Sequence, residues 1–114
     1  MAAHKDEARL DQAINEIQDQ PCSDSCKLIM LRALRSVIGL AHYGSYAVGG
    51  LALTTVLGCV LQTLSNPNPR PEDQKWLDQN SHDTVRKIIA ANLANIVLQQ
   101  SLITTFEERL DRAI

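Results

Sequence analysis

The residues best suited to bind a metal ion are two cysteines close together in the sequence. Cys22 and Cys26 are four positions apart, so their thiols can converge if a helix begins between them. Three histidines could complete a zinc site with them: His4, His42 and His82. A closed zinc site usually contains a second pair of ligands with matching spacing, and the sequence has no such pair. We therefore predict no metal, and interpret both cysteines as packing contacts at the corner made by Pro21.

Other residues that could catalyse a reaction lack the surroundings that catalysis needs. Cys59 lies in the most apolar segment, where a thiol is normally inert, and the pair Gly49–Gly50 has no phosphate-loop pattern around it. Three carboxylate pairs lie beside cations on polar stretches, so we expect them to be solvated: Asp6–Glu7, Glu72–Asp73 and Glu107–Glu108. The sequence therefore predicts a protein that is not an enzyme and has no cofactor.

The charge of the chain argues against nucleic acid as a partner. The chain contains eleven Lys and Arg residues and thirteen Asp and Glu residues, which gives a net charge of −2. The compact basic features are Arg32 with Arg35 and Arg86 with Lys87, too few for a strong phosphate-binding surface. We therefore predict no binding to DNA or RNA.

Composition indicates the fold class. The 114 residues are 45% hydrophobic and 21% charged but only 4% aromatic, so a core must be built from aliphatic side chains, which suit helices. We predict an all-α fold, with residues 1–114 as a single-domain helical bundle of four to five helices. Three cysteines and a polar beginning of the sequence lead us to expect reduced thiols in the cytoplasm.

The first two helices are predicted from their apolar spacing. Residues 4–19 carry a narrow apolar stripe of one helical face: Leu10, Ala13, Ile14 and Ile17. Pro21 ends this helix, and the short polar residues 23–25 can cap a second helix over 24–43. The second helix has a broader apolar face: Leu28, Leu31, Leu34, Val37, Ile38 and Ala41.

The segment 46–64 contains no charged residue and allows three interpretations. We favour a central helix buried by its neighbours, with Gly50, Thr54 and Gly58 forming a smooth stripe for close helix packing. A membrane span of this length is the second interpretation, although its threonines and its glutamine dilute the hydrophobicity. The third is an exposed apolar face that a second subunit covers.

A proline-rich connector over 65–71 separates this segment from the last two helices. Its alternating prolines favour a stiff, extended chain. Pro71 suits the first turn of a short helix over 71–79, and we expect Trp76 and Leu77 to hold that helix onto the core.

The C-terminal region predicts one long helix over 82–112, capped by Ser81, because it contains neither Gly nor Pro. Eight residues alternate in spacings of four and three, as in a coiled-coil seam: Val85, Ile89, Asn92, Ile96, Gln99, Ile103, Phe106 and Leu110. An amide in such a seam can fix the register of two paired helices, although Asn92 and Gln99 can equally face solvent. We predict this seam as a protein interface.

Together these features predict a small non-enzymatic protein that binds another protein, such as an inhibitor, an adaptor or an assembly subunit, and that forms a homodimer. The first alternative is a small membrane-associated protein that spans the bilayer with residues 46–64. The second is a regulatory protein that binds a small apolar ligand in the core of the bundle.

Overall fold

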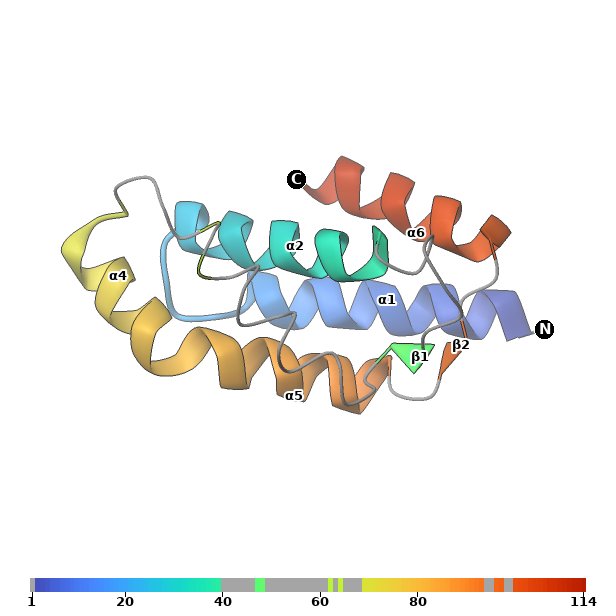
Figure 1. Ribbon diagram of the computed structural model, residues 1–114, viewed down its shortest axis with the longest axis horizontal. Helices are drawn as coiled ribbons and strands as arrows, with labels where there is room; N and C mark the ends of the chain where they lie inside the picture. Colours follow the sequence, from blue (N-terminus) through green and yellow to red (C-terminus); the bar gives the residue numbers. More distant parts are fainter. Residues whose placement is uncertain are drawn as a thin grey trace.

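The protein is all-α, as predicted. The computed structural model describes the backbone of residues 2–39, 47–48, 62, 64, 69–93, 96–97 and 100–114. The helices are α1 (Ala2–Gln18), α2 (Asp24–Gly39), α4 (Pro71–Trp76), the π-helical turn η2 (Leu77–Ser81), α5 (His82–Asn92) and α6 (Gln100–Ala113) (Figure 1). Two short strands, β1 (Ala47–Val48) and β2 (Ile96–Val97), pair antiparallel, with Ala47 opposite Val97.

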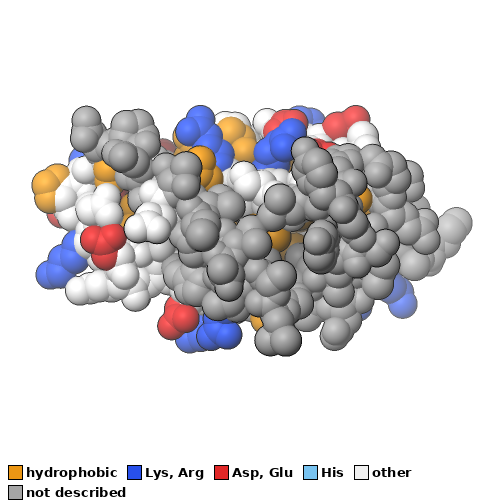
Figure 2. Space-filling model, in the orientation of Figure 1, with side chains coloured by type: hydrophobic (Ala, Val, Ile, Leu, Met, Phe, Trp, Pro, Cys, Tyr) orange, Lys and Arg blue, Asp and Glu red, His pale blue; other side chains and the backbone are white. Residues whose placement is uncertain are grey.

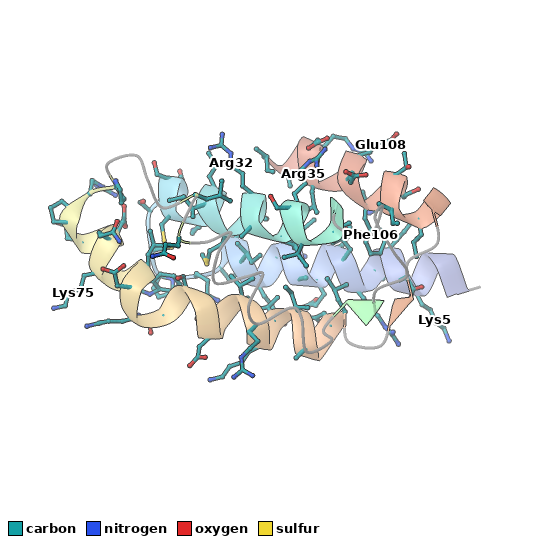
Figure 3. All side chains as sticks on the ribbon, in the orientation of Figure 1. Lys5, Arg32, Arg35, Lys75, Phe106 and Glu108 are labelled. Carbon is teal, nitrogen blue, oxygen red and sulfur yellow. The ribbon has the colours of Figure 1, made fainter. Side chains whose placement is uncertain are left out.

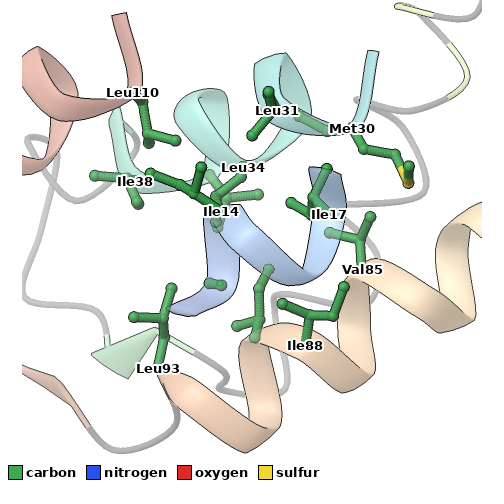
Figure 4. Packing of buried hydrophobic residues seen from close by; sticks show 14 of the residues in the cluster. Ile14, Ile17, Met30, Leu31, Leu34, Ile38, Val85, Ile88, Leu93 and Leu110 are labelled. Carbon is green, nitrogen blue, oxygen red and sulfur yellow. The ribbon is translucent and has the colours of Figure 1, made fainter. Parts of the chain in front are cut away.

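Helix α1 lies at the centre of the bundle, between α2 and α5, and α6 packs against both α1 and α2 (Figure 1). The apolar stripe of α1 that the sequence predicts is buried along its whole length. In Figure 4, Ile14 and Ile17 of α1 lie between Leu34 of α2 and Ile88 of α5. Residues three and four positions apart lie on one face of a helix, so the apolar stripe of α1 forms a single face. The apolar side chains of α2 and α5 pack on that face in one core.

The prediction of a single C-terminal helix over 82–112 is wrong. Helix α5 ends at Asn92, strand β2 follows, and α6 begins at Gln100. A straight helix of that length would extend about 45 Å, whereas the 17-residue α1 offers only about 25 Å of surface to pack on. The break lets both halves of the region bury their apolar faces on the same short core.

The predicted helix over 46–64 is wrong at Ala47 and Val48, which form β1. Gln62 and Leu64 are helical, and the rest of this segment lies outside the described residues. The predicted close-packing stripe of Gly50, Thr54 and Gly58 also lies outside them.

Helices α4 and α5 are joined through η2 without an N-cap at Ser81. Its backbone is helical, with φ −58 and ψ −47, and its hydroxyl donates to the carbonyl of Leu77 one turn earlier. The amide of Asn80 donates in the same way to the carbonyl of Trp76, at 3.2 Å. Both carbonyls thus accept a side-chain hydrogen bond at the π-helical turn through which α4 continues into α5. Leu77 is buried and Trp76 packs against the core, as predicted.

Ion pairs of two arginines connect α6 with α2 and with α1. Arg35 of α2 pairs with Asp111 at 2.7 Å and with Glu107 at 3.2 Å. Arg109 of α6 pairs with Asp11 of α1 at 2.6 Å, and also with Glu7. Because these side chains are partly exposed, each pair contributes at most about 1 kcal/mol, and the apolar face of α6 provides most of its attachment.

Candidate functional site

The predicted interface seam lies largely inside the core of the chain. Five of its members are at most 2% exposed: Val85, Ile89, Ile103, Phe106 and Leu110. Asn92 is half-buried and donates its amide to Glu16 of α1 at 3.2 Å and to the carbonyl of Ile88. Ile96 lies in β2, and Gln99 lies outside the described residues. A second subunit is therefore not needed to cover the five buried side chains.

The two neighbouring cysteines lie near one another. At the start of α2, the thiols of Cys22 and Cys26 each perturb the pKa of the other. Burial raises the pKa of both thiols above their ordinary value, so both are protonated at neutral pH. In the described part of the chain, no group of three potential ligands surrounds them or lies elsewhere, and the side chains of the three histidines lie outside that part.

The start of α2 is held by Ser23, which caps the helix and also binds α4. Its hydroxyl oxygen accepts the backbone N–H of Cys26 at 3.2 Å, in the manner of an N-cap. Its own backbone N–H donates to Asp73 at 3.3 Å, and its hydroxyl donates to the other carboxylate oxygen of Asp73. Arg70 adds a weaker contact to Asp73 at 3.4 Å. One carboxylate thus connects the first turn of α4 to the first turn of α2.

The expectation that the pair Glu72–Asp73 is solvated is wrong for Asp73, which is only 6% exposed. The hydrogen bond from the Ser23 hydroxyl, with the Ser23 backbone N–H and the charge of Arg70, holds the pKa of Asp73 below its ordinary value. Asp73 is therefore ionised at neutral pH. The sequence offers one local signal for Asp73, which is a carboxylate in the first turn of a helix, two residues after Pro71. The partner of Asp73 in the structure, Ser23, is fifty residues away in the sequence.

We expect Asp73→Asn to destabilise the protein at pH 7 and to have a progressively smaller effect in acid. The folded-state pKa of Asp73 is depressed, so its contribution is present above the unfolded pKa and is lost as the pH falls through the lower, folded pKa. Urea unfolding of wild type and variant at several pH values between neutral and strongly acidic measures this difference. Glu72→Gln is the matched control, because Glu72 is exposed and adjacent. A stability difference that does not shrink in acid would contradict the assignment.

Two grooves lie on either side of the amino-terminal half of α2. The first has a volume of about 520 Å³ and is bounded on its far side by the chain that leads into α4, including Leu64, Pro69 and Arg70. The second, of about 350 Å³, is bounded by the ends of α1 and α6, including Gln18 and Ala113. Three residues of α2 line both grooves and separate them: Asp24, Ser25 and Leu28. We name these three residues the Leu28 ridge.

Cations surround the Leu28 ridge. Lys27 lines the second groove, and Arg32 and Arg70 line the first. The carboxylates there are the exposed Asp24 and the buried Asp73, whose charge Ser23 and Arg70 already satisfy. In the described part of the chain, neither Lys27 nor Arg32 has an ion-pair partner. Arg70 is paired with Asp73. Lys27 and Arg32 remain beside the exposed Asp24, so this surface carries charges of both signs.

The figures place this surface on the outside of the bundle. Figure 3 shows Arg32 extending from α2 away from α1 and α5. Figure 2 shows Lys and Arg side chains beside hydrophobic side chains along the upper edge of the molecule, where Figure 1 places α2 and α6, and Asp and Glu side chains lie along the same edge. Sequence analysis places Leu28 on the apolar face of its helix, but in the structure Leu28 is only half-buried, at the margin of that face.

Comparison with protein-family models, with curated proteins and with solved structures finds no match to this chain. Among the described residues, no helix has both the length and the apolar character that crossing a membrane requires.

Proposed function

We propose that the protein is a non-enzymatic binding module that holds another protein through the Leu28 ridge and its two grooves. One observation carries this proposal: a half-buried leucine stands between two surface grooves whose margins carry Lys27 and Arg32, neither of which has an ion-pair partner in the described part of the chain. An apolar centre within a polar, charged margin is the usual organisation of a protein interface.

The shape of the surface favours a helix or an extended segment as the bound element. When helices pack, the side-chain ridge of one enters the groove of the other, and the Leu28 ridge with its flanking grooves offers both features. Apolar side chains of the partner would enter the grooves beside Leu28 and Ile29. Acidic side chains next to them would pair with Lys27 and Arg32. We therefore propose a partner segment with apolar anchors flanked by Asp or Glu.

The chemistry of the surrounding groups supports binding more than catalysis. General acid–base catalysis works best with a pKa near the working pH, whereas the pKa of Asp73 is depressed and the pKa values of both nearby thiols are raised. The homodimer stays a prediction. Because five residues of its proposed seam are buried in the chain's own core, a second copy would have to bind through other residues.

A peptide-display selection against the purified protein tests the proposal. We expect the selected peptides to combine apolar anchors with Asp or Glu, and to bind more weakly at high salt, because charges at an interface margin are screened. Leu28→Ala and Arg32→Glu should each weaken binding about tenfold or more, which corresponds to the roughly 1.4 kcal/mol or more expected of a central contact.

Lys87→Glu is the matched control, since it makes the same charge change at an exposed residue of α5 away from both grooves. Light scattering of the same variants reports self-association. The proposal is contradicted if Leu28→Ala and Arg32→Glu bind the selected peptides as well as Lys87→Glu does. If Leu28→Ala instead abolishes self-association, the partner is a second copy and the proposal of a different protein fails.

A further inference from the structure

Arg70, on the far wall of the first groove, has a fixed backbone although most of its side chain is exposed. It is the residue before α4, and its backbone is extended, with φ −58 and ψ 150, as the following Pro71 favours. Its carbonyl accepts the backbone N–H of Gln74 at 2.9 Å. The start of α4 therefore sets the direction in which the Arg70 side chain leaves the chain.

The ion pair of Arg70 joins an exposed cation to a buried acid. The Arg70 side chain is 67% exposed, whereas the Asp73 side chain is 8% exposed. Among the described residues, two other ion pairs have this spacing, and their acids are 22% and 66% exposed. Ser23 occupies both carboxylate oxygens of Asp73, one through its backbone N–H and the other through its hydroxyl. Asp73 is thus a fixed anchor for the guanidinium.

The contact with Asp73 uses only one nitrogen of the Arg70 guanidinium. The Nε–H donates to Oδ2 of Asp73 at 3.4 Å, which is longer than an ordinary hydrogen bond. Within the part of the chain that the structure describes, the two terminal nitrogens have no hydrogen-bond partner. A guanidinium carries its N–H donors in one rigid plane. The terminal donors are therefore available to a ligand while Nε keeps its contact with Asp73.

The lining of the first groove indicates which ligand these donors suit. Arg70 lies beside the apolar Leu64 and Pro69, so a charged group bound there would be next to an apolar one. The groove is lined by two arginines and two aspartates, and its formal charges balance. This balance favours a carboxylate, with a single negative charge, over a phosphate group, with nearly two.

We propose, on the basis of the proposed function, that Arg70 binds a carboxylate of the partner segment with its terminal nitrogens while its Nε stays on Asp73. The carboxylate belongs to an Asp or Glu beside the apolar anchor that enters the first groove. Its two oxygens accept two parallel N–H bonds from the guanidinium, the arrangement in which arginine holds a carboxylate most specifically. Asp73 is a positioning residue, because its contact orders the guanidinium before the partner arrives and lowers the entropy lost on binding.

Affinities of one selected peptide and of its counterparts with single acidic residues changed to the amide test this assignment. Arg70→Gln should weaken the acidic peptide about fivefold or more, and should weaken one amide counterpart less than about twofold. Arg70→Lys keeps the charge but lacks the planar fork, so it should lose about threefold or more. Arg86→Gln is the matched control, because Arg86 pairs with an acid at the same spacing on α5 and lines neither groove.

The outcomes separate this assignment from the proposed function. If no peptide is selected, or if the peptides bind Leu28→Ala as well as wild type, the proposed function fails and the role of Arg70 fails with it. If binding depends on Leu28 but Arg70→Gln weakens the acidic peptide and all amide counterparts equally, only the role of Arg70 is overturned. Full affinity of Arg70→Lys, or tighter binding of a peptide with phosphoserine in place of the acid, would also overturn it.

Discussion

Replacing Phe106 by alanine should remove about 3–5 kcal/mol from the free energy of unfolding, a large part of the roughly 5–15 kcal/mol typical of a small domain. Phe106 is fully buried and is the largest of the completely buried side chains. It projects from α6 toward α1 (Figure 3), and its apolar neighbours on α6 are Ile103 and Leu110. The variant would lose the transfer free energy of the ring and leave a cavity between helices.

Urea unfolding followed by circular dichroism measures this loss. Glu108→Ala is the matched control on the same helix, because Glu108 is exposed and its truncation should change stability by no more than about 0.5 kcal/mol. Phe106→Leu should lose less than Phe106→Ala, because it keeps most of the apolar volume. A loss below about 1 kcal/mol for Phe106→Ala would mean that α6 does not pack on α1 and α2 as described.

The second large effect is expected at Ile89. Its measurement shows whether Ile89 packs in the core of one chain or at an interface between two chains. Ile89 is fully buried on α5, which packs against α1. Ile89→Ala should therefore cost about 2–5 kcal/mol of unfolding free energy. Because the contact lies within one chain, that cost should not depend on protein concentration, whereas a contact between subunits would make the unfolding midpoint rise with concentration.

Unfolding at two protein concentrations, compared with the exposed-site control Lys87→Ala, distinguishes the two cases. If Ile89→Ala left each chain as stable as the wild type and changed only self-association, the predicted coiled-coil interface over residues 85–110 would be supported. The burial described for Ile89 would then be wrong.

The sequence predicts most of the helical elements because their signals are local. The apolar stripe of α1, the polar cap at residues 23–25 and the Pro71 start are each formed by residues within one or two turns, and the helices found there begin within two residues of the predicted positions. Such signals need no knowledge of the rest of the chain.

The candidate site could be predicted only in part, because its contacts cross long sequence separations. The proximity of Cys22 and Cys26 follows from their spacing at a helix start, and the structure confirms it. The bond from Ser23 to Asp73 spans fifty residues, and no periodicity relates the two. The grooves beside Leu28 likewise depend on where α4 and α6 come to lie.

The sequence by itself determined the helices α1, α2 and α4 and the apolar faces of the first two, because the alternation of apolar and polar residues acts over a few positions. Only the tertiary structure decided that the chain turns between Asn92 and Gln100, so that one apolar pattern becomes two helices on a shared core. The physical reason is the limited length of α1: a continuous helix would extend past the surface that can bury it, so the chain reverses to cover its apolar residues.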